Sequence, residues 1–419
     1  MYPKIICHVD VNSAFLSWTA AHKVHVLGHS LDLRTVPSAI GGDETKRHGI
    51  ILAKSQPAKK YGIQTGEPIA SALRKCPDLI IEPPNYDLYV DASRKLISAL
   101  GDMVPSVQQY SIDEAWIDIS GTQSEYGPPL EAASFIKDNI KERFGFTVNI
   151  GVSTNTLLAK MAGDFQKPDK VHSLFPHEIE KKLWPLSADK LFMVGPATKQ
   201  KLSAIGIHTI GDIARADLSQ IKACLGKHGV LVWNYANGIA DERVDPFTPL
   251  NKGYGNSTTT VRDITDAKSA KKIFLSLCET VGMRMRKDDQ EGKCVGIHIR
   301  SNKFENVSAQ MQLSEPSNVT AHIYSAACAL FDKLWDGKTP LRQLGVHMSK
   351  VSRCACKQYS LFDCGKTEKL EKLDAAVDSI RERFGEMAIY RACFLNDSDN
   401  SPLGGGLHAR RRTGITKPA

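Results

Sequence analysis

The chain has 419 residues, of which 42% are apolar and 24% are charged. This composition is typical of a soluble globular protein and excludes a disordered or fibrous chain, and at ~100–200 residues per domain the length allows two to four domains. The net charge of +8 is compatible with a polyanionic partner such as a nucleic acid.

Membrane insertion and export are not expected. No apolar run approaches the ~20 residues that cross a bilayer, and the apolar run at residues 5–7 is interrupted by His8 and Asp10 before a signal-peptide core could form. The ten cysteines lack the paired spacing of a disulfide framework, which favours reduced thiols. We therefore expect a cytoplasmic protein with no membrane partner.

The first predicted elements are a strand and a helix on either side of an acid. Residues 5–9 predict a short buried strand, Asp10 lies where that strand ends, and residues 14–21 predict a helix. Residues 22–77 form a smaller basic segment, which could fold over a substrate as a separate lobe.

Two further strands are predicted later in the chain. Residues 114–120 alternate between apolar and polar side chains, and residues 147–152 form an apolar run that a helical pattern through Leu157, Leu158 and Met161 follows. Strands that alternate with helices around carboxylates favour an α/β domain.

From Leu186 onward the pattern changes to short helices with glycine turns at 192–197 and 206–211. This is typical of a helix-hairpin-helix unit, which directs backbone N–H groups and a helix N-terminus at a DNA phosphate. Gly195 stands in the first turn, although Ala197 occupies a position where a second glycine is commoner.

The last third of the chain is basic. Residues 238–249, with two prolines, are expected to be a linker, and residues 246–353 contain 16 Lys and Arg against 10 Asp and Glu. Alternating stretches at 295–300 and 344–349 predict strands, so this segment is a candidate nucleic-acid surface. Residues 396–419 are expected to be a disordered basic tail.

The most specific chemical signal is the adjacent pair Asp113 and Glu114, flanked by the apolar Ile112 and Trp116. Isolated acidic pairs are most often solvated, but burial here would be costly unless a cation compensates. With Asp10 as a third carboxylate, the set suits two Mg²⁺ ions, because magnesium prefers oxygen ligands and phosphoryl transfer uses ions about 3.5–4 Å apart.

Taken in order, these motifs resemble the Y-family, or translesion, DNA polymerases of the bacterial DinB and UmuC type. The resemblance spans roughly residues 4–350. It rests on the segments around Asp10 and 111–114, on Lys160 and Lys167 with Pro168, on the hairpin near Gly195, and on residues 253–256.

The resemblance implies an α/β multidomain fold, the right-hand polymerase with an α+β little finger. The implied boundaries are palm 1–20 and 78–166, fingers 21–77, helix-hairpin-helix thumb 167–240, DNA-binding little finger 247–353, and a C-terminal tail 354–419.

It also implies site residues. Asp10, Asp113 and Glu114 would be the catalytic metal ligands, the Val11 carbonyl would complete one of two Mg²⁺ sites, and Phe15 would be the steric gate that excludes a 2′-hydroxyl. The alternative for Phe15 is a core aromatic on the first turn of the helix.

Only some of the residues at the family's triphosphate-binding positions match the types that are common in relatives. Lys167 matches the palm lysine that contacts the triphosphate, and Asn12 belongs to the nucleotide-binding segment after Asp10. Gln56 and Lys59 align with positions where relatives commonly have Tyr and Arg. Lys59 keeps the charge but lacks the bidentate fork of arginine, so the roles of both residues stay open.

Outside the catalytic core, the resemblance implies DNA contacts and a clamp-binding peptide. The implied DNA contacts are Gly195, Lys252, Asn256 and Arg300, and the peptide is Gln358, Leu361 and Phe362. Leu361 and Phe362 would enter a groove on the bacterial sliding clamp while Gln358 fixes the register; the alternative is a loop packed on the chain's own core.

The expected partners are primer-template DNA, deoxynucleoside triphosphates and the clamp, with the enzyme itself a monomer. Residues 366–395 predict one amphipathic helix that packs against the little finger or binds a partner. Two other functions compete with the polymerase: a clamp-recruited DNA-binding scaffold without catalysis, and another two-metal enzyme such as a nuclease or cyclase.

Overall fold

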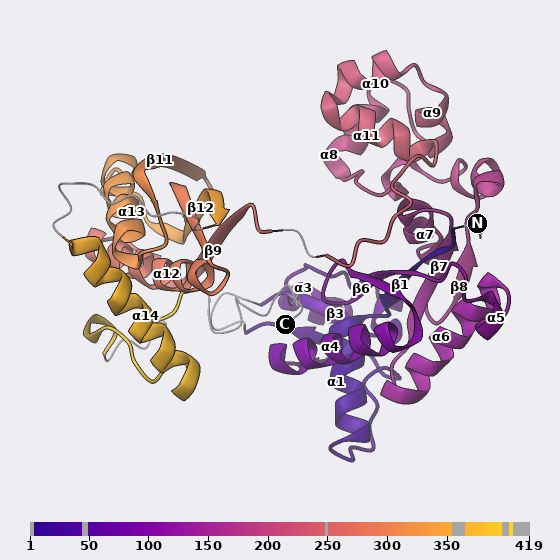
Figure 1. The fold of residues 1–419 in the computed structure, drawn as a ribbon, viewed down its shortest axis with the longest axis horizontal. Coiled ribbons are helices and arrows are strands. Elements are labelled where there is room, and N and C mark those ends of the chain that lie inside the picture. Colours follow the sequence, from indigo (N-terminus) through magenta and orange to yellow (C-terminus); the bar gives the residue numbers. More distant parts are fainter. Residues whose placement is uncertain (1–3, 44–48, 248–249, 354–364, 396–401, 405–419) are drawn as a thin grey trace. The chain divides into compact units, whose positions relative to one another are not determined.

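The structure, a computed structural model, describes residues 4–43, 49–247, 250–353, 365–395 and 402–404. These residues form two compact units: most of the first lies before residue 248 and most of the second lies after residue 249 (Figure 1). In the described part of the chain, no helix is both long and apolar enough to cross a membrane.

The centre of the first unit is a five-stranded sheet with the order β5-β6-β1-β7-β8. Its central strand β1 is antiparallel to both neighbours, β6 and β7, and the register places Asp10 directly opposite Glu114. The strands are β1 (Ile6–Val11), β5 (Ser106–Gln109), β6 (Glu114–Asp118), β7 (Val148–Ser153) and β8 (Val171–Ser173).

The two faces of this sheet differ because side chains alternate along a strand. Cys7, Val9 and Val11 bury one face of β1 in a core shared with α4 (Tyr86–Met103) and α6 (Pro129–Phe144). His8 and Asp10 point to the other face. The strand includes Asp10 and Val11, so it is longer than the predicted 5–9 and the acid lies within it.

Helix α7 (Thr156–Gly163) packs on the face that carries His8. It approaches β7 so closely that a Cβ on Gly151 would lie 1.9 Å from the Ala159 carbonyl oxygen. Only glycine fits at position 151, and this close packing brings the side chains of α7 to the carboxylate edge of the sheet.

A second, smaller sheet has the order β3-β2-β4. It has its own core, which includes Ala39, Ile51, Ile63 and Ile69. Its elements, with the helix that leads into it, are α1 (Ala14–His25), β2 (Ser38–Gly41), β3 (Ile51–Lys54), α2 (Gln56–Lys60), α3 (Ile69–Lys75) and β4 (Ile80–Glu82).

The short helices predicted from Leu186 onward are present and share a core that includes Leu202, Ile213 and Val232. They are α8 (Pro196–Ser203), α9 (Ile210–Arg215), α10 (Leu218–Leu225) and α11 (Lys227–Ala236). Single-turn segments at Pro176–Glu178, Ile179–Leu183 and Ala188–Lys190 precede them, and α5 (Gln123–Tyr126) is a further short helix.

The segment expected to be a linker contains no helix or strand from 239 to 247, but it is attached to the first unit. The Thr156 backbone N–H donates to the Asp241 carbonyl oxygen at 3.1 Å, and Val244 packs beside Trp116. The Asp245 N–H donates to the Gln108 side chain at 3.0 Å. These contacts extend the first unit to residue 245.

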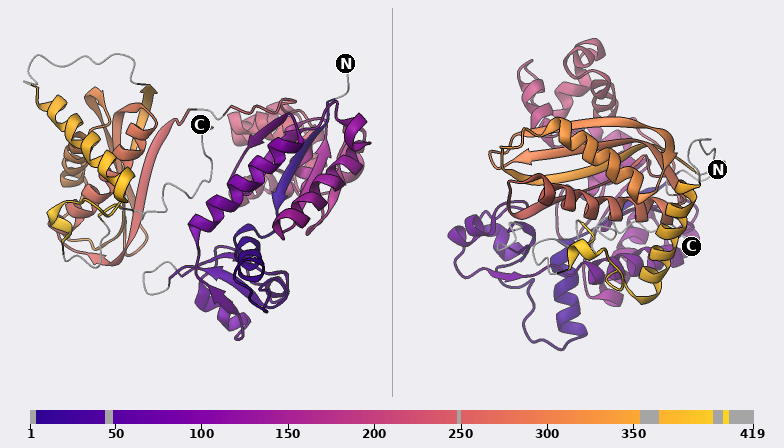
Figure 2. Two further views of the ribbon diagram at one scale, coloured as in Figure 1. Left: turned by 60° about the horizontal axis from the view of Figure 1, so that its bottom comes forward. Right: turned by 90° about the vertical axis from the view of Figure 1, so that its left-hand side faces the viewer.

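The second unit is a four-stranded antiparallel sheet, order β11-β10-β12-β9, with α12 and α13 packed on one face (Figure 2). The predicted strands at 295–300 and 344–349 lie within β10 and β12. The elements are β9 (Gly253–Ile264), α12 (Ala267–Lys287), β10 (Gln290–Ser301), β11 (Asn306–Ser317), α13 (Thr320–Leu334) and β12 (Leu341–Arg353).

The predicted helix 366–395 is shorter in the structure. Helix α14 spans Lys366–Phe384 and ends at Gly385, whose φ of +97° breaks the helix at little steric cost. A separate single turn follows at Ala392–Phe394. Of the two alternatives, packing on the second unit is observed.

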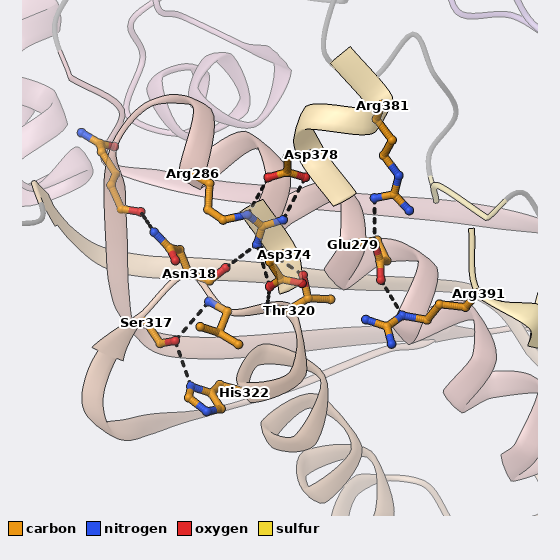
Figure 3. Close-up of polar contacts among 12 residues, drawn as sticks. Glu279, Arg286, Ser317, Asn318, Thr320, His322, Asp374, Asp378, Arg381 and Arg391 are labelled. Carbon is orange, nitrogen blue, oxygen red and sulfur yellow. Dashed lines mark hydrogen bonds and ion pairs between the residues drawn. The ribbon is translucent and has the colours of Figure 1, made fainter. Parts of the chain in front are cut away.

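The contact face of α14 is polar (Figure 3). Asp374 and Arg381 are its buried residues, whereas Leu373, one of the apolar residues whose spacing predicted an amphipathic helix, is 50% exposed. Arg286 of α12 pairs with Asp374 at 3.1 Å and with Asp378 at 2.6 Å. Of the apolar residues spaced at three and four along this helix, Leu370 and Val377 are partly buried and Leu373 and Ile380 are exposed, so ion pairs make up much of the contact face.

Candidate active site

Three carboxylates lie close together where two neighbouring strands of the first unit's sheet, β1 and β6, reach the same end of the sheet. Asp10 on β1 faces Glu114 on β6 across an antiparallel pair, which puts both side chains on the same face. Asp113 immediately precedes β6, and its carbonyl oxygen accepts from the Val11 N–H at 3.0 Å. The Ser111 hydroxyl donates to the Asp113 carboxylate at 2.7 Å.

The three acids influence one another electrostatically. Burial raises the pKa of Asp10 to about 6, the Lys167 ammonium opposes this shift, and the nearby Glu114 and Asp113 reinforce it. A carboxyl group that is only 8% exposed and has two acidic neighbours favours a cation.

Two lysines neutralise part of this charge. Lys167 donates to the Asp10 carboxylate and also pairs with Asp164 at 2.8 Å. Burial opposes the charged form of Lys167, but Asp10 and Asp164 together raise its pKa. Lys160 pairs with Glu114 at 2.6 Å.

The oxygen donors present are those that Mg²⁺ prefers, so their chemistry fits divalent metal ions. Within the described ranges, however, no three His, Cys, Asp or Glu side chains converge closely enough to hold one ion. Asp10 and Glu114 are each engaged by a lysine instead. A metal ion bound by this set would therefore share these carboxylates with the lysines or displace the lysines.

A cavity of about 350 Å³ lies beside Asp10 and Asp113. It brings together eight of the residues predicted to bind metal or nucleotide, from the palm-like sheet, from α1 and from the small sheet with α2. These eight are Asp10, Val11, Asn12, Phe15, Gln56, Lys59, Asp113 and Lys167. Glu114 is not among the lining residues.

The cavity also contains lining residues that were not predicted as site residues, although Lys54 belongs to the basic segment 22–77. Lys54, Ser55 and Thr65 come from the small sheet and its loops, and Ser13 adopts a left-handed turn with φ of +49° between β1 and α1. Burial, then the neighbouring Lys59, lowers the pKa of Lys54. Two lysines so close together indicate a site for a strongly anionic group, and the alternation of β3 was the signal that could have identified Lys54.

Phe15 belongs to an aromatic cluster and also lines the cavity. Its ring stacks on Tyr89 with centroids 4.3 Å apart and contacts Tyr86 edge-on at 6.1 Å, and the residue also lines the cavity. Asn12 is 7% exposed, and its amide donates to the Thr147 hydroxyl at 3.1 Å. The aromatic cluster gives Phe15 a rigid support at the cavity wall.

The residues predicted to contact DNA lie in different units. Gly195 caps α8 in the first unit, whereas Lys252, Asn256 and Arg300 belong to the second. Arg300 alternates with the buried residues of β10 and so lies on the sheet face opposite the helices, bonded to Asn306 at 2.7 Å. Asn256 donates to the carbonyl oxygen of Gly404.

The proposed clamp peptide, Gln358, Leu361 and Phe362, lies outside the described residues.

Comparison with known proteins matches two family profiles to this chain. The impB/mucB/samB family matches residues 9–164, and the impB/mucB/samB family C-terminal domain matches residues 251–361. The first match contains the three carboxylates, and the second contains the sheet of the second unit.

Curated relatives align along nearly the whole chain. A DNA polymerase IV of Clostridium acetobutylicum is 43% identical over 400 residues, which cover 94% of this chain and 99% of the relative. A DNA polymerase IV of Acetivibrio thermocellus is 35% identical over 399 residues, covering 94% and 98%.

A solved structure shares the fold. It is a chimeric Y-family DNA polymerase that superposes with a TM-score of 0.71 at 21% identity, over 83% of this chain and 99% of the solved chain.

Proposed function

The chain belongs to the impB/mucB/samB family, within the DinB-type Y-family DNA polymerases, and we propose that Asp10, Asp113 and Glu114 carry its chemistry. Membership makes it a DNA-directed DNA polymerase of the translesion type. Its substrates are therefore DNA and deoxynucleoside triphosphates, and divalent metal ions are its cofactors.

The proposed reaction is attack of the primer 3′-hydroxyl on the α-phosphate of the incoming nucleotide, with pyrophosphate released. Two Mg²⁺ ions, when bound, would stabilise the attacking and leaving oxygens. Asp10, Asp113 and Glu114 would hold them with the Val11 carbonyl, and Lys167 would move from Asp10 to the triphosphate. The observation that carries this assignment is the cavity lined by Asp10, Asp113 and Lys167, in which Lys167 donates to the Asp10 carboxylate.

The remaining cavity residues suit the parts of a nucleotide. Lys54 and Lys59 supply positive charge for the triphosphate, and Gln56 offers an amide, so a lysine in β3 supplements the missing arginine. Phe15, stacked on Tyr89, would lie under the sugar, and Asn12 lies beside the metal ligands.

We further assign the palm to residues 1–20 and 78–166, the fingers to 21–77, the thumb to 167–240 and the little finger to 247–353. In support, the small sheet with α2 and α3 and the second unit each have a core of their own, and the helices α8–α11 share a core with α7.

Primer extension separates this function from its rivals. Purified protein with a 5′-labelled primer-template, Mg²⁺ and all four deoxynucleotides should lengthen the primer in template-directed steps. A nuclease would shorten the primer, a scaffold would leave its length unchanged, and a cyclase would consume nucleotide without primer; any of these three results would refute the polymerase assignment.

Clamp binding is the second part of the proposal. Burial of Leu361 and Phe362 in a groove could contribute roughly 1.5–3 kcal/mol each before ordering costs, enough for a weak contact. The double change Leu361→Ala, Phe362→Ala should abolish clamp-stimulated synthesis and leave unassisted extension intact. Leu373→Ala, at an exposed leucine of α14, is the matched control. Equal clamp stimulation of the double variant and the parent would exclude the tether.

A further inference from the structure

Lys160 is a buried lysine next to the proposed catalytic acids that the mechanism above does not use. It lies on α7 and is only 8% exposed. Its Nζ is 2.6 Å from Oε1 of Glu114 and 3.4 Å from Nε2 of His8 on β1. The close packing of α7 at Gly151 brings it there.

Two aromatic rings complete the surroundings of the ammonium group. Nζ lies 5.3 Å from the ring centroid of Tyr110 and 5.3 Å from that of Phe192. The two rings meet edge-on with centroids 6.3 Å apart. The two distances of 5.3 Å from Nζ to the ring centroids are within the range of a favourable cation–π contact.

This enclosure distinguishes Lys160 from Lys167. Lys167 lines the cavity, so it can exchange Asp10 for a triphosphate. Lys160 is bonded to a carboxylate and an imidazole and is enclosed by two rings. A buried cation without its partner is an uncompensated buried charge, which is strongly unfavourable. Lys160 is therefore a fixed partner of Glu114.

We propose that Lys160 is a positioning residue that occupies Oε1 of Glu114, so that this carboxylate offers only its other oxygen to metal. Because Phe192 precedes α8, the same contact links Glu114 to the proposed thumb. This inference rests on the proposed function, since it assumes that Glu114 is a metal ligand.

Removal of the Lys160 charge should affect metal binding and chemistry in opposite directions. Without a neighbouring cation, and with both oxygens free, Glu114 should bind a divalent ion more tightly. Nucleotide addition should become slower, because the carboxylate is no longer held in one orientation. A residue that merely stabilised the fold would weaken both.

The test compares Lys160→Met, which keeps length but removes charge, with Lys160→Arg, which keeps charge and can still donate to Glu114. Lys181→Met, at an exposed lysine, is the matched control. Mn²⁺ affinity is measured by electron paramagnetic resonance without DNA or nucleotide, and the single-turnover rate of nucleotide addition is measured at saturating metal.

For Lys160→Met we expect Mn²⁺ to bind about tenfold more tightly, with a rate reduced at least about tenfold. Lys160→Arg should keep parental Mn²⁺ affinity, and Lys181→Met should match the parent in both. Weaker or unchanged Mn²⁺ binding, or an unchanged rate, in Lys160→Met would overturn the inference.

Phe192→Leu provides a test should Lys160→Met fail to fold, because it keeps the lysine and removes one aromatic face. It should slow nucleotide addition by holding Lys160 less firmly and leave Mn²⁺ affinity parental, because the charge beside Glu114 remains; a parental rate would overturn the inference. Failure of the proposed function would give a different result. Either the parent would not bind Mn²⁺, or Asp113→Ala would bind Mn²⁺ as tightly as the parent.

Discussion

Phe15 lines the cavity, and two aromatic neighbours hold its ring in place. Its parallel stacking on Tyr89 and edge contact with Tyr86 leave little freedom for the ring. An aromatic ring fixed in this way can reject a nucleotide by steric contact, because it cannot move aside when an extra hydroxyl arrives.

Phe15→Ala should therefore increase incorporation of ribonucleotides relative to deoxynucleotides by roughly a hundredfold, the range that a close steric fit can achieve. Competitive single-nucleotide insertion measures the ratio. Phe144→Ala removes a ring that stacks on Phe146 away from the cavity, and serves as the control. Unchanged sugar discrimination in Phe15→Ala would show that Phe15 is only a core residue.

Individual residues also show what could be predicted from the sequence. Asp10, Asp113 and Lys167 could be identified because each lies in a short motif, and the cavity brings them together. The contact of Lys160 with Glu114 and His8 could not, since these residues are 46 and 152 positions away and meet only through the packing of α7.

Among the elements, α14 is held to the second unit by buried charges. Glu279 of α12, with a side chain 5% exposed, pairs with Arg381 at 2.8 Å and Arg391 at 2.6 Å, and a second network centres on Arg286 (Figure 3). The apolar periodicity of α14 could predict a helix but not the ion pairs on its contact face, because charged contacts leave no periodic apolar signal.

Glu279→Leu should lower the free energy of unfolding by about 3–5 kcal/mol, because it leaves Arg381 buried without its partner. The double variant Glu279→Leu, Arg381→Met should recover most of this loss, since neither charge remains. Denaturant unfolding measures both. A single variant as stable as the parent would mean that the pair does not hold the helix.

For the whole molecule, the candidate active site and the basic segment belong to different units. The first contains the carboxylates and the cavity, and the second contains the basic segment 246–353. In the second unit, Arg300 lies on the sheet face that α12 and α13 leave uncovered, while Lys333 lies on α13. This division was predictable from the distribution of charge. The attachment of residues 241–245 to the first unit was not, because it uses backbone groups of this segment and the packing of one side chain, Val244.

If Arg300 contacts a DNA phosphate, primer-template affinity should fall with salt, and Arg300→Gln should reduce the log–log slope by about 0.9. Lys333→Gln, on the helical side of the same unit, should leave the slope unchanged. Fluorescence anisotropy over a series of salt concentrations measures both slopes. Equal slopes for Arg300→Gln and the parent would place the DNA surface elsewhere.

The central claim is that the carboxylate set carries nucleotidyl transfer, and Asp113→Ala tests it most directly. The measurement is the single-turnover rate of nucleotide addition to a bound primer-template, with DNA affinity and melting temperature recorded beside it. Loss of charge stabilisation worth several kcal/mol predicts a rate at least about a thousandfold lower, with DNA affinity and folding preserved. A rate within about tenfold of the parent, a difference of only 1.4 kcal/mol, would contradict the account.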